Sequence, residues 1–130
     1  MPGHVGILGG TFDPPHRGHL ALARAALREA GLDVVLLVPT CVPPHKATPR
    51  DTSQEDRLAM TRRLADADAG VEVSDLELRR GGTSYTIDTV RALIAEHPGV
   101  RYRLILGADM AEEFGQWREA DRLVRLAPPL

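Results

Sequence analysis

The fold is decided near the N-terminus by the stretch HVGILGGTFDPPHRGH, residues 4–19. Its first part, His4 to Leu8, is mostly apolar and predicts a short buried strand. Gly9 and Gly10 then end the strand, because consecutive glycines favour a turn. A helix follows from Arg17 to Ala30, with apolar residues on one face. The stretch therefore predicts a strand, a glycine-rich turn and a helix in immediate succession.

A second apolar run, Val34 to Val38, does not alternate with polar residues. Strands of this kind are usually covered on both faces, as they are in parallel sheets. A proline-rich loop, Pro39 to Asp51, separates this strand from the next helix, and its length favours a functional role.

The rest of the chain continues the alternation of strands and helices. The capping-box pattern Thr52-Ser53-Gln54-Glu55 predicts a helix that runs to about Asp66, with Leu58 and Leu64 facing inward. An alternating strand is expected over Val71–Leu78, and a helix capped by Thr86 over Thr86–His97. A further strand is expected over Val100–Leu106, followed by a final helical region up to Arg125. This order predicts a single α/β domain over residues 1–130, a Rossmann-like open parallel sheet with helices on both faces.

The composition excludes several classes of protein. The net charge of −2 gives no basic field that would attract nucleic acid. Cys41 is the one cysteine, so no internal disulfide can form, which fits a reducing cytoplasm. No apolar run is long enough to cross a membrane, and no signal peptide is expected at the N-terminus. We therefore expect a cytoplasmic globular protein.

The turn after the first strand has the features of an anion site. Gly9 and Gly10 let the backbone approach a ligand closely and expose N–H groups. His16 and His19 are three residues apart, so they lie on one face at the start of the helix, where the helix dipole is positive. A polyphosphate bound there would raise the pKa of both imidazoles toward the protonated form. The pattern predicts a polyphosphate site at the carboxyl end of the first strand.

Two other interpretations of the histidines stay open at this point. Both side chains are compatible with ordinary surface residues near a helix start. Their spacing also suits zinc, for which Cys41 and His45 are the candidate further ligands. The glycine pattern is neither the dinucleotide-binding fingerprint nor a Walker A loop, since GGT does not match G-x-G-x-x-G and no lysine follows.

The motif GGTFDPPHRGH, residues 9–19, resembles the signature of the H-x-G-H adenylyltransferase superfamily. In this form it is similar to the bacterial nicotinate-nucleotide adenylyltransferases. Three later segments support the resemblance in the same order along the chain, namely Pro39–Lys46, Ser84-Tyr85-Thr86, and Gly107–Asp109 followed by Trp117. The resemblance implies that the adenylyl group of ATP is transferred to nicotinate mononucleotide, giving nicotinate adenine dinucleotide and diphosphate in NAD biosynthesis.

The resemblance also implies a role for each motif. His16 and His19 are the expected catalytic residues, acting on the triphosphate. The residues expected to bind ATP and its phosphates are Gly9, Gly10, Thr11, Phe12, His16, Gly18, His19, Lys46, Gly107 and Asp109. Those expected on the mononucleotide side are Thr40, Ser84, Tyr85, Thr86, Trp117 and Arg118, with Trp117 stacked on the pyridine ring. Mg²⁺ is expected to bind through the ATP phosphates, with no metal ligand of the protein's own.

The resemblance has one departure. Family members continue with another strand and a Ser-Ser/Thr-x-x-Arg segment that contacts the triphosphate, and no equivalent follows Ala127 to Leu130. Three alternatives therefore accompany the nicotinate assignment: a pantetheine-phosphate acceptor, a nicotinamide mononucleotide acceptor, or a catalytically inactive nucleotide-binding fragment. An exposed sheet edge would also favour a homo-oligomer.

Overall fold

A computed structural model describes residues 3–12, 14–41 and 53–130. Within them, one parallel sheet has the strand order β3-β2-β1-β4. The strands are β1 His4–Gly10, β2 Val34–Pro39, β3 Val71–Val73 and β4 Arg101–Leu104. The helices are α1 Arg17–Ala30, α2 Gln54–Ala65, α3 Leu76–Arg80, α4 Thr86–Glu96, α5 Ala108–Glu113 and α6 Ala120–Leu126, with a 3-10 helix at Phe114–Gln116.

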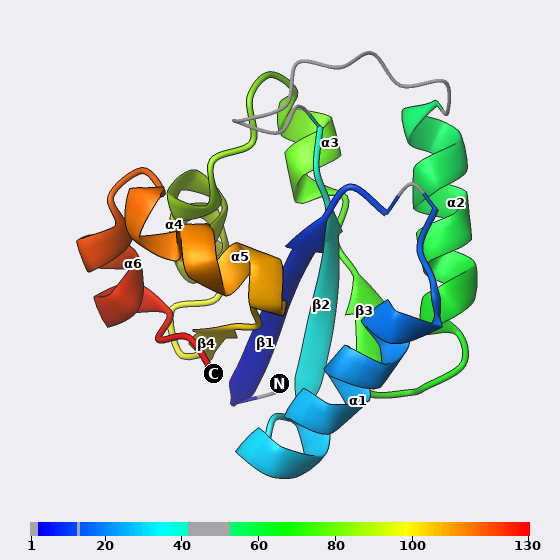
Figure 1. Ribbon diagram of the computed structural model, residues 1–130, viewed down its shortest axis with the longest axis horizontal. Coiled ribbons are helices and arrows are strands. Elements are labelled where there is room, and N and C mark those ends of the chain that lie inside the picture. Colours follow the sequence, from blue (N-terminus) through cyan, green and yellow to red (C-terminus); the bar gives the residue numbers. More distant parts are fainter. Residues whose placement is uncertain (1–2, 13, 42–52) are drawn as a thin grey trace.

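Alternate residues of β1 point into two separate cores, which places helices on both faces of the sheet. Leu8 packs with buried residues of α1 and α2. Val5 and Ile7, on the opposite face, pack with buried residues of α4 and α6. Figure 1 shows α1 and α2 on one side of the sheet and α4, α5 and α6 on the other. This is the predicted doubly covered sheet, and it explains why Val34 to Val38 is apolar throughout.

Helix α1 has the predicted bounds and apolar face. Leu20 and Ala23 are buried, and Leu27 packs against the same core. The helix ends at Gly31, whose φ of 65° lies in the left-handed region that glycine adopts without a steric cost.

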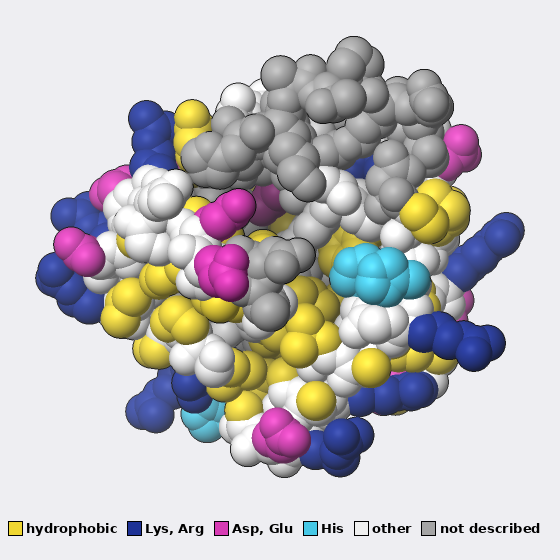
Figure 2. Space-filling view, viewed as in Figure 1, with side chains coloured by type: hydrophobic (Ala, Val, Ile, Leu, Met, Phe, Trp, Pro, Cys, Tyr) yellow, Lys and Arg dark blue, Asp and Glu magenta, His cyan; other side chains and the backbone are white. Residues whose placement is uncertain are grey.

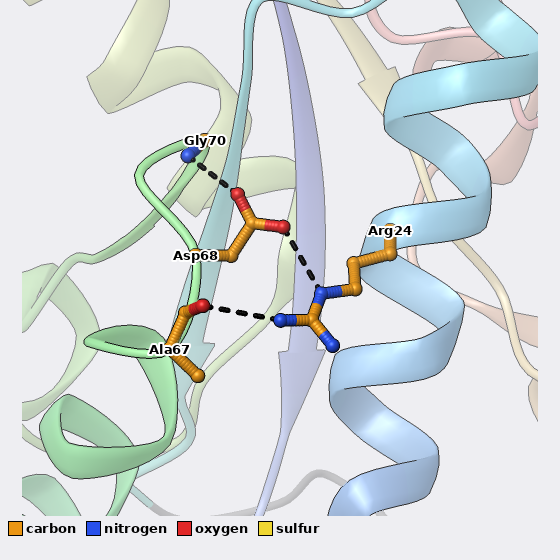
Figure 3. Close-up of polar contacts among 4 residues, drawn as sticks. All are labelled: Arg24, Ala67, Asp68 and Gly70. Carbon is orange, nitrogen blue, oxygen red and sulfur yellow. Dashed lines mark hydrogen bonds and ion pairs between the residues drawn. The ribbon is translucent and has the colours of Figure 1, made fainter.

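A polar contact ties α1 to the turn before β3 (Figure 3). Arg24 Nε donates to Asp68 Oδ2 at 3.0 Å, and Arg24 Nη2 donates to the carbonyl oxygen of Ala67 at 3.1 Å. The other carboxylate oxygen of Asp68 accepts the Gly70 N–H at 2.8 Å. The Gly70 hydrogen bond and then the Arg24 guanidinium hold the pKa of Asp68 below its ordinary value. This carboxylate therefore joins the first helix to the entry of the edge strand.

The predicted strand Val71–Leu78 is wrong in its second half, since β3 stops at Val73 and α3 begins at Leu76. The Ser74 N–H donates to the Leu37 carbonyl at 3.0 Å, and the Ser74 hydroxyl accepts the Leu76 N–H at 3.3 Å. The serine thus turns the chain away from the sheet. The next five residues, Leu-Glu-Leu-Arg-Arg, are good helix formers. Their alternating apolar and polar side chains therefore lie on a short helix and not on a strand.

Two helix starts also differ from the prediction by one residue. Ser53 caps α2 with its hydroxyl, which accepts the Asp56 N–H at 3.1 Å. Tyr85 stands at the N-cap of α4, with no side-chain cap, and Thr86 is the first helical residue. On α2 the most buried side chains are those of Arg57, Thr61 and Ala65. Leu64 faces the core as expected, whereas Leu58 is only half-buried.

The last residues lie along the outer edge of β4. Pro129 forms a parallel bridge with Leu104, whose N–H donates to the Pro128 carbonyl at 3.3 Å. Arg103 Nε donates to the Pro128 carbonyl at 2.9 Å, and Nη2 donates to the Pro129 carbonyl at 3.1 Å.

Within the described residues, no helix is both long enough and apolar enough to cross a membrane.

Candidate active site

The carboxyl ends of β1, β2 and β4 lie at one edge of the sheet, because these strands are parallel. The segment that leads to His16 follows β1, Thr40 follows β2, and Gly107 follows β4. Ser84 is drawn to the same edge, since its Oγ accepts the Cys41 N–H at 3.0 Å. The structure therefore brings the two predicted halves of the site to one end of the domain.

His16 and His19 form a single unit at the start of α1. The His16 Nδ1 accepts the Gly18 N–H at 3.1 Å, and the His19 Nδ1 accepts the His16 N–H at 3.0 Å. The two rings stack with their centroids 3.8 Å apart and an interplanar angle of 24°. Figure 2 shows histidine surface in cyan where Figure 1 places the first turn of α1. The pair thus caps the helix and is open to solvent.

These hydrogen bonds fix the tautomer of both neutral rings. A Nδ1 that accepts a backbone N–H carries no proton, so the proton of each ring is on Nε2. The Nε2–H of each ring takes no part in these two cap hydrogen bonds. Burial, and next the proximity of His16, lower the pKa of His19 from its ordinary value. A rise of the imidazole pKa values in the presence of polyphosphate stays a prediction about the bound state.

A steric contact explains why position 18 is glycine. A Cβ at this position would lie 2.9 Å from Cε1 and Nδ1 of the His16 ring, closer than real Cβ contacts allow. The glycine in H-x-G-H therefore provides the surface on which the first histidine rests. At Gly9, Gly10 and Gly107 a Cβ would meet only ordinary contacts or open space. Packing of the described residues does not require glycine at these three positions, which is compatible with close approach of a ligand.

Phe12 anchors the turn between β1 and the histidines. It is buried, and its φ of 49° is in the left-handed region that non-glycine residues rarely adopt. Its ring contacts the His19 ring edge-on, with the centroids 4.7 Å apart. Phe12 therefore supports the histidine pair from the protein side, and its expected contact with ATP stays a prediction.

On the mononucleotide side, Ser84 belongs to a buried polar network. It hydrogen-bonds Glu77, which also accepts the Thr89 hydroxyl at 2.6 Å. Arg80 Nη2 donates to the Thr89 Oγ1 at 3.1 Å. Burial raises the pKa of Glu77, while the hydrogen bonds and Arg80 oppose the rise. Ser84 is itself buried, and its hydroxyl joins the turn before α4 to Cys41, which follows β2; its expected contact with the mononucleotide stays a prediction.

The aromatic residues of this half-site are partly covered. The Arg118 guanidinium lies 4.2 Å from the centroid of the Tyr85 ring. Trp117 is partly exposed and contacts Phe114 with a centroid distance of 5.2 Å. Trp117 also packs against the core on the α4 side of the sheet. It therefore has both a structural contact and a free part of its surface.

Sequence reasoning missed Arg57 and Glu77, which are both buried beside the candidate residues. Arg57 Nη1 donates to the carbonyl oxygens of Thr11 and Thr40, at 2.7 and 2.9 Å. The signal for Arg57 was the i, i+4 spacing of Arg57, Thr61 and Ala65, which defines the inward face of α2. No such spacing pointed to Glu77, because it was assigned to a strand.

Some predicted site residues lie outside what the structure describes. These are Lys46 and His45, together with the side chain of Asp109, whose backbone belongs to α5. Among the side chains that are described, no three His, Cys, Asp or Glu residues gather closely enough to hold a metal ion.

The sequence matches the cytidylyltransferase-like family over residues 7–128. The parallel sheet and the H-x-G-H pair at its carboxyl edge are in agreement with this match, and the chain belongs to that family. A probable nicotinate-nucleotide adenylyltransferase of Halalkalibacterium halodurans is 47% identical over 121 residues, which are 92% of this chain and 58% of that protein. One of Listeria monocytogenes is 40% identical over 126 residues, which are 97% of this chain and 67% of the relative. Within the wider family, the chain belongs to the nicotinate-nucleotide adenylyltransferases.

Solved structures share the fold. A putative nicotinate-nucleotide adenylyltransferase from Vibrio parahaemolyticus superposes with a TM-score of 0.80 at 18% identity, covering 98% of this chain and 76% of that one. A Plasmodium falciparum nicotinic acid mononucleotide adenylyltransferase complexed with NaAD gives a TM-score of 0.79 at 20% identity, covering 94% of this chain and 60% of that one. The chain thus spans about three fifths of the length of several relatives.

Proposed function

We propose that this chain transfers the adenylyl group of ATP to nicotinate mononucleotide, giving nicotinate adenine dinucleotide and diphosphate. The observation that carries the proposal is the His16–His19 pair, whose two Nε2–H donors stand at the start of α1. The Ser84 turn, held at the same edge of the sheet, supplies the second half-site. The names of the relatives support nicotinate mononucleotide as the acceptor.

In this reaction the protein itself has to carry out little covalent chemistry. The phosphate of the mononucleotide is already an anion, so it attacks the α-phosphorus of ATP without a general base. The bond to the bridging oxygen then breaks, and diphosphate leaves with the electron pair. His16 and His19 donate hydrogen bonds to the negative charge that develops on the α-phosphate and on the leaving group. The N-terminus of α1 adds its partial positive charge.

The second half-site suits an aromatic acid. The N–H groups of Thr86 and Ile87 are in the first turn of α4, where they have no carbonyl partner within the helix. Such a helix start favours a carboxylate. The free part of Trp117 is available for stacking on the pyridine ring. Together these groups would select nicotinate mononucleotide by its charge and its ring.

Mg²⁺ fits this site as a companion of ATP. The described residues offer no cluster of metal ligands, and Mg²⁺ needs few of them when phosphate oxygens and water fill its coordination sphere. When bound, it would neutralise the charge of the phosphates. We place the reaction in the cytoplasm, in line with the single cysteine.

Diphosphate release tests the proposal, measured with ATP and Mg²⁺ and one acceptor at a time. Nicotinate mononucleotide should give the highest kcat/KM. A higher value with nicotinamide mononucleotide or phosphopantetheine would overturn the acceptor assignment. The same assay distinguishes one further outcome, a nucleotide-binding protein without turnover. Calorimetric binding of ATP, without diphosphate release from any acceptor, would support that alternative.

A further inference from the structure

Adenylyl transfer needs two substrates in line, yet the two half-sites are on different segments of the chain. The segment with the histidines follows β1, and the Ser84 turn precedes α4. Both segments lie outside the bounds of strands β1 to β4. A group that joins both segments would therefore set the distance between the substrates.

Arg57 provides the first part of such a link. Its side chain is 1% exposed, and it enters the site from the first turn of α2. One nitrogen, Nη1, donates to the Thr11 carbonyl at 2.7 Å and to the Thr40 carbonyl at 2.9 Å. Nη1 has two hydrogens, so both bonds form at the same time. The guanidinium thus links the segment after β1 to the segment after β2.

Hydrogen bonds of Thr40 and Cys41 strengthen this link from the β2 side. The backbone N–H of Thr40 donates to the Gly10 carbonyl at 2.9 Å, and the Thr40 hydroxyl donates to the same oxygen at 3.0 Å. The next residue, Cys41, donates its N–H to Ser84 at 3.0 Å. A continuous path of hydrogen bonds therefore runs from Thr11 through Arg57 and Thr40 to the turn before α4.

Arg57 is itself held in place by α2. Its backbone N–H donates to the Ser53 carbonyl at 3.0 Å, and its carbonyl accepts the buried Thr61 hydroxyl at 2.7 Å. A guanidinium suits this position because its charge is spread over a rigid plane with several donors. Lysine has a single ammonium on a flexible stem, so it does not reproduce the fixed geometry of the two bonds.

We propose that Arg57 is a positioning residue for adenylyl transfer. Through the Thr11 and Thr40 carbonyls it fixes the ATP side of the site against the acceptor side, without touching either substrate. The inference rests on the proposed function. A misplacement of about 1 Å between reacting groups can cost about 10²-fold in rate, so a loosened joint reduces the rate of transfer more than the binding of either substrate.

The test compares Arg57→Lys with Arg63→Lys, a matched control on the exposed side of the same helix. Single-turnover formation of nicotinate adenine dinucleotide gives the transfer rate, and calorimetry gives the affinity for each substrate alone. Arg57→Lys should lower the transfer rate by about 10²-fold and change each affinity far less. Arg63→Lys should match wild type. A transfer rate at the wild-type level, or affinities that fall as much as the rate, would overturn the proposal.

Two further measurements keep the test decisive. If Arg57→Lys does not fold, Thr40→Val removes only the hydroxyl bond to Gly10, and its transfer rate should also fall; an unchanged rate contradicts the proposal.

If wild type makes no product, the proposed function fails, and the link that Arg57 forms between Thr11 and Thr40 is tested by binding alone. A non-hydrolysable ATP analogue should then tighten mononucleotide binding to wild type and to Arg63→Lys, but not to Arg57→Lys or Thr40→Val. No difference between these proteins would contradict the role of Arg57.

Discussion

His19 accepts the backbone N–H of His16 through its Nδ1 at 3.0 Å, while the two imidazoles stack at 3.8 Å. The contact that starts helix α1 is therefore the same contact that orients the proposed catalytic groups. A helix cap is usually a serine, threonine, asparagine or aspartate. The use of histidine here combines capping through Nδ1 with an Nε2–H donor on each ring.

The capping and chemical roles of His16 can be separated by substitution. His16→Asn keeps a good N-cap, so its melting temperature should stay near that of wild type. His16→Ala should lose about 1 kcal/mol of stability, because the cap is gone. Both variants lack the Nε2–H donor, and removal of such a donor typically lowers kcat by about 10²- to 10³-fold. Diphosphate release and thermal melting measure the two effects.

His4→Asn is the matched control, since His4 is exposed at the amino end of β1, away from the proposed site. It should retain the wild-type rate. An asparagine variant at His16 that also retained the wild-type rate would show that His16 is only a cap.

His19→Ala should abolish adenylyl transfer while the fold is retained. In the proposed mechanism the side chain donates to the developing charge, and its removal also takes away the acceptor of the His16 N–H. Product formation measures the loss, and circular dichroism checks the fold. Turnover at the wild-type rate in a folded His19→Ala protein would contradict the mechanism.

Gly18→Ala should impair activity without unfolding the protein. The new Cβ would meet the His16 ring at 2.9 Å and force it to move. Alanine gains about 1 kcal/mol of helix propensity over glycine, which offsets most of the lost cap. The transfer rate should fall by about 10²-fold, since the donor is misplaced. Gly99→Ala, where a Cβ meets no atom within 4 Å, should behave as wild type; equal rates for both variants would refute the steric account of Gly18.

Trp117 is the single tryptophan, and the proposed function places it in the acceptor half-site. Nicotinate mononucleotide should quench its emission by stacking, while ATP alone should leave the emission nearly unchanged. Trp117→Ala should raise the KM for the mononucleotide more than the KM for ATP. Equal rises in both KM values would show that Trp117 acts only through its packing against Phe114 and the core.

The Arg24–Asp68 contact predicts how stability depends on pH. The pKa of Asp68 is lowered in the folded protein, so its contribution is present above the unfolded pKa of about 4 and is lost as pH falls through the folded pKa. The difference in melting temperature between wild type and Asp68→Asn should therefore be greatest near pH 7 and shrink as the pH falls below about 4. Glu29→Gln, on the exposed face of α1, serves as control. A difference that is constant with pH would rule out this role for the carboxylate.

The sequence was sufficient to predict the elements whose signal is local. The apolar runs of β1 and β2 predicted parallel buried strands, and the caps and apolar face predicted α1 with its bounds. The H-x-G-H motif located the candidate site at the end of β1. These features depend on residues near one another in the chain. The structure confirms the strands and the helix, and the role of the site stays a prediction.

What the sequence did not predict depends on contacts between distant residues. No local pattern around Arg57 shows that the fold places it beside the Thr11 and Thr40 carbonyls. The helix α3 was read as strand, because Val71 to Leu78 alternates and nothing local shows that Ser74 leaves the sheet. Both errors arose where tertiary hydrogen bonds override a local pattern.

The central claim is that the α-phosphorus of ATP becomes bonded to the phosphate of nicotinate mononucleotide on this chain. Its most direct test follows ATP labelled at the α-phosphate or at the γ-phosphate, with Mg²⁺ and nicotinate mononucleotide. The account predicts that the α-label appears in nicotinate adenine dinucleotide and the γ-label in diphosphate, at a rate that His19→Ala abolishes. The absence of α-label from the dinucleotide, under conditions where ATP binds, would contradict it.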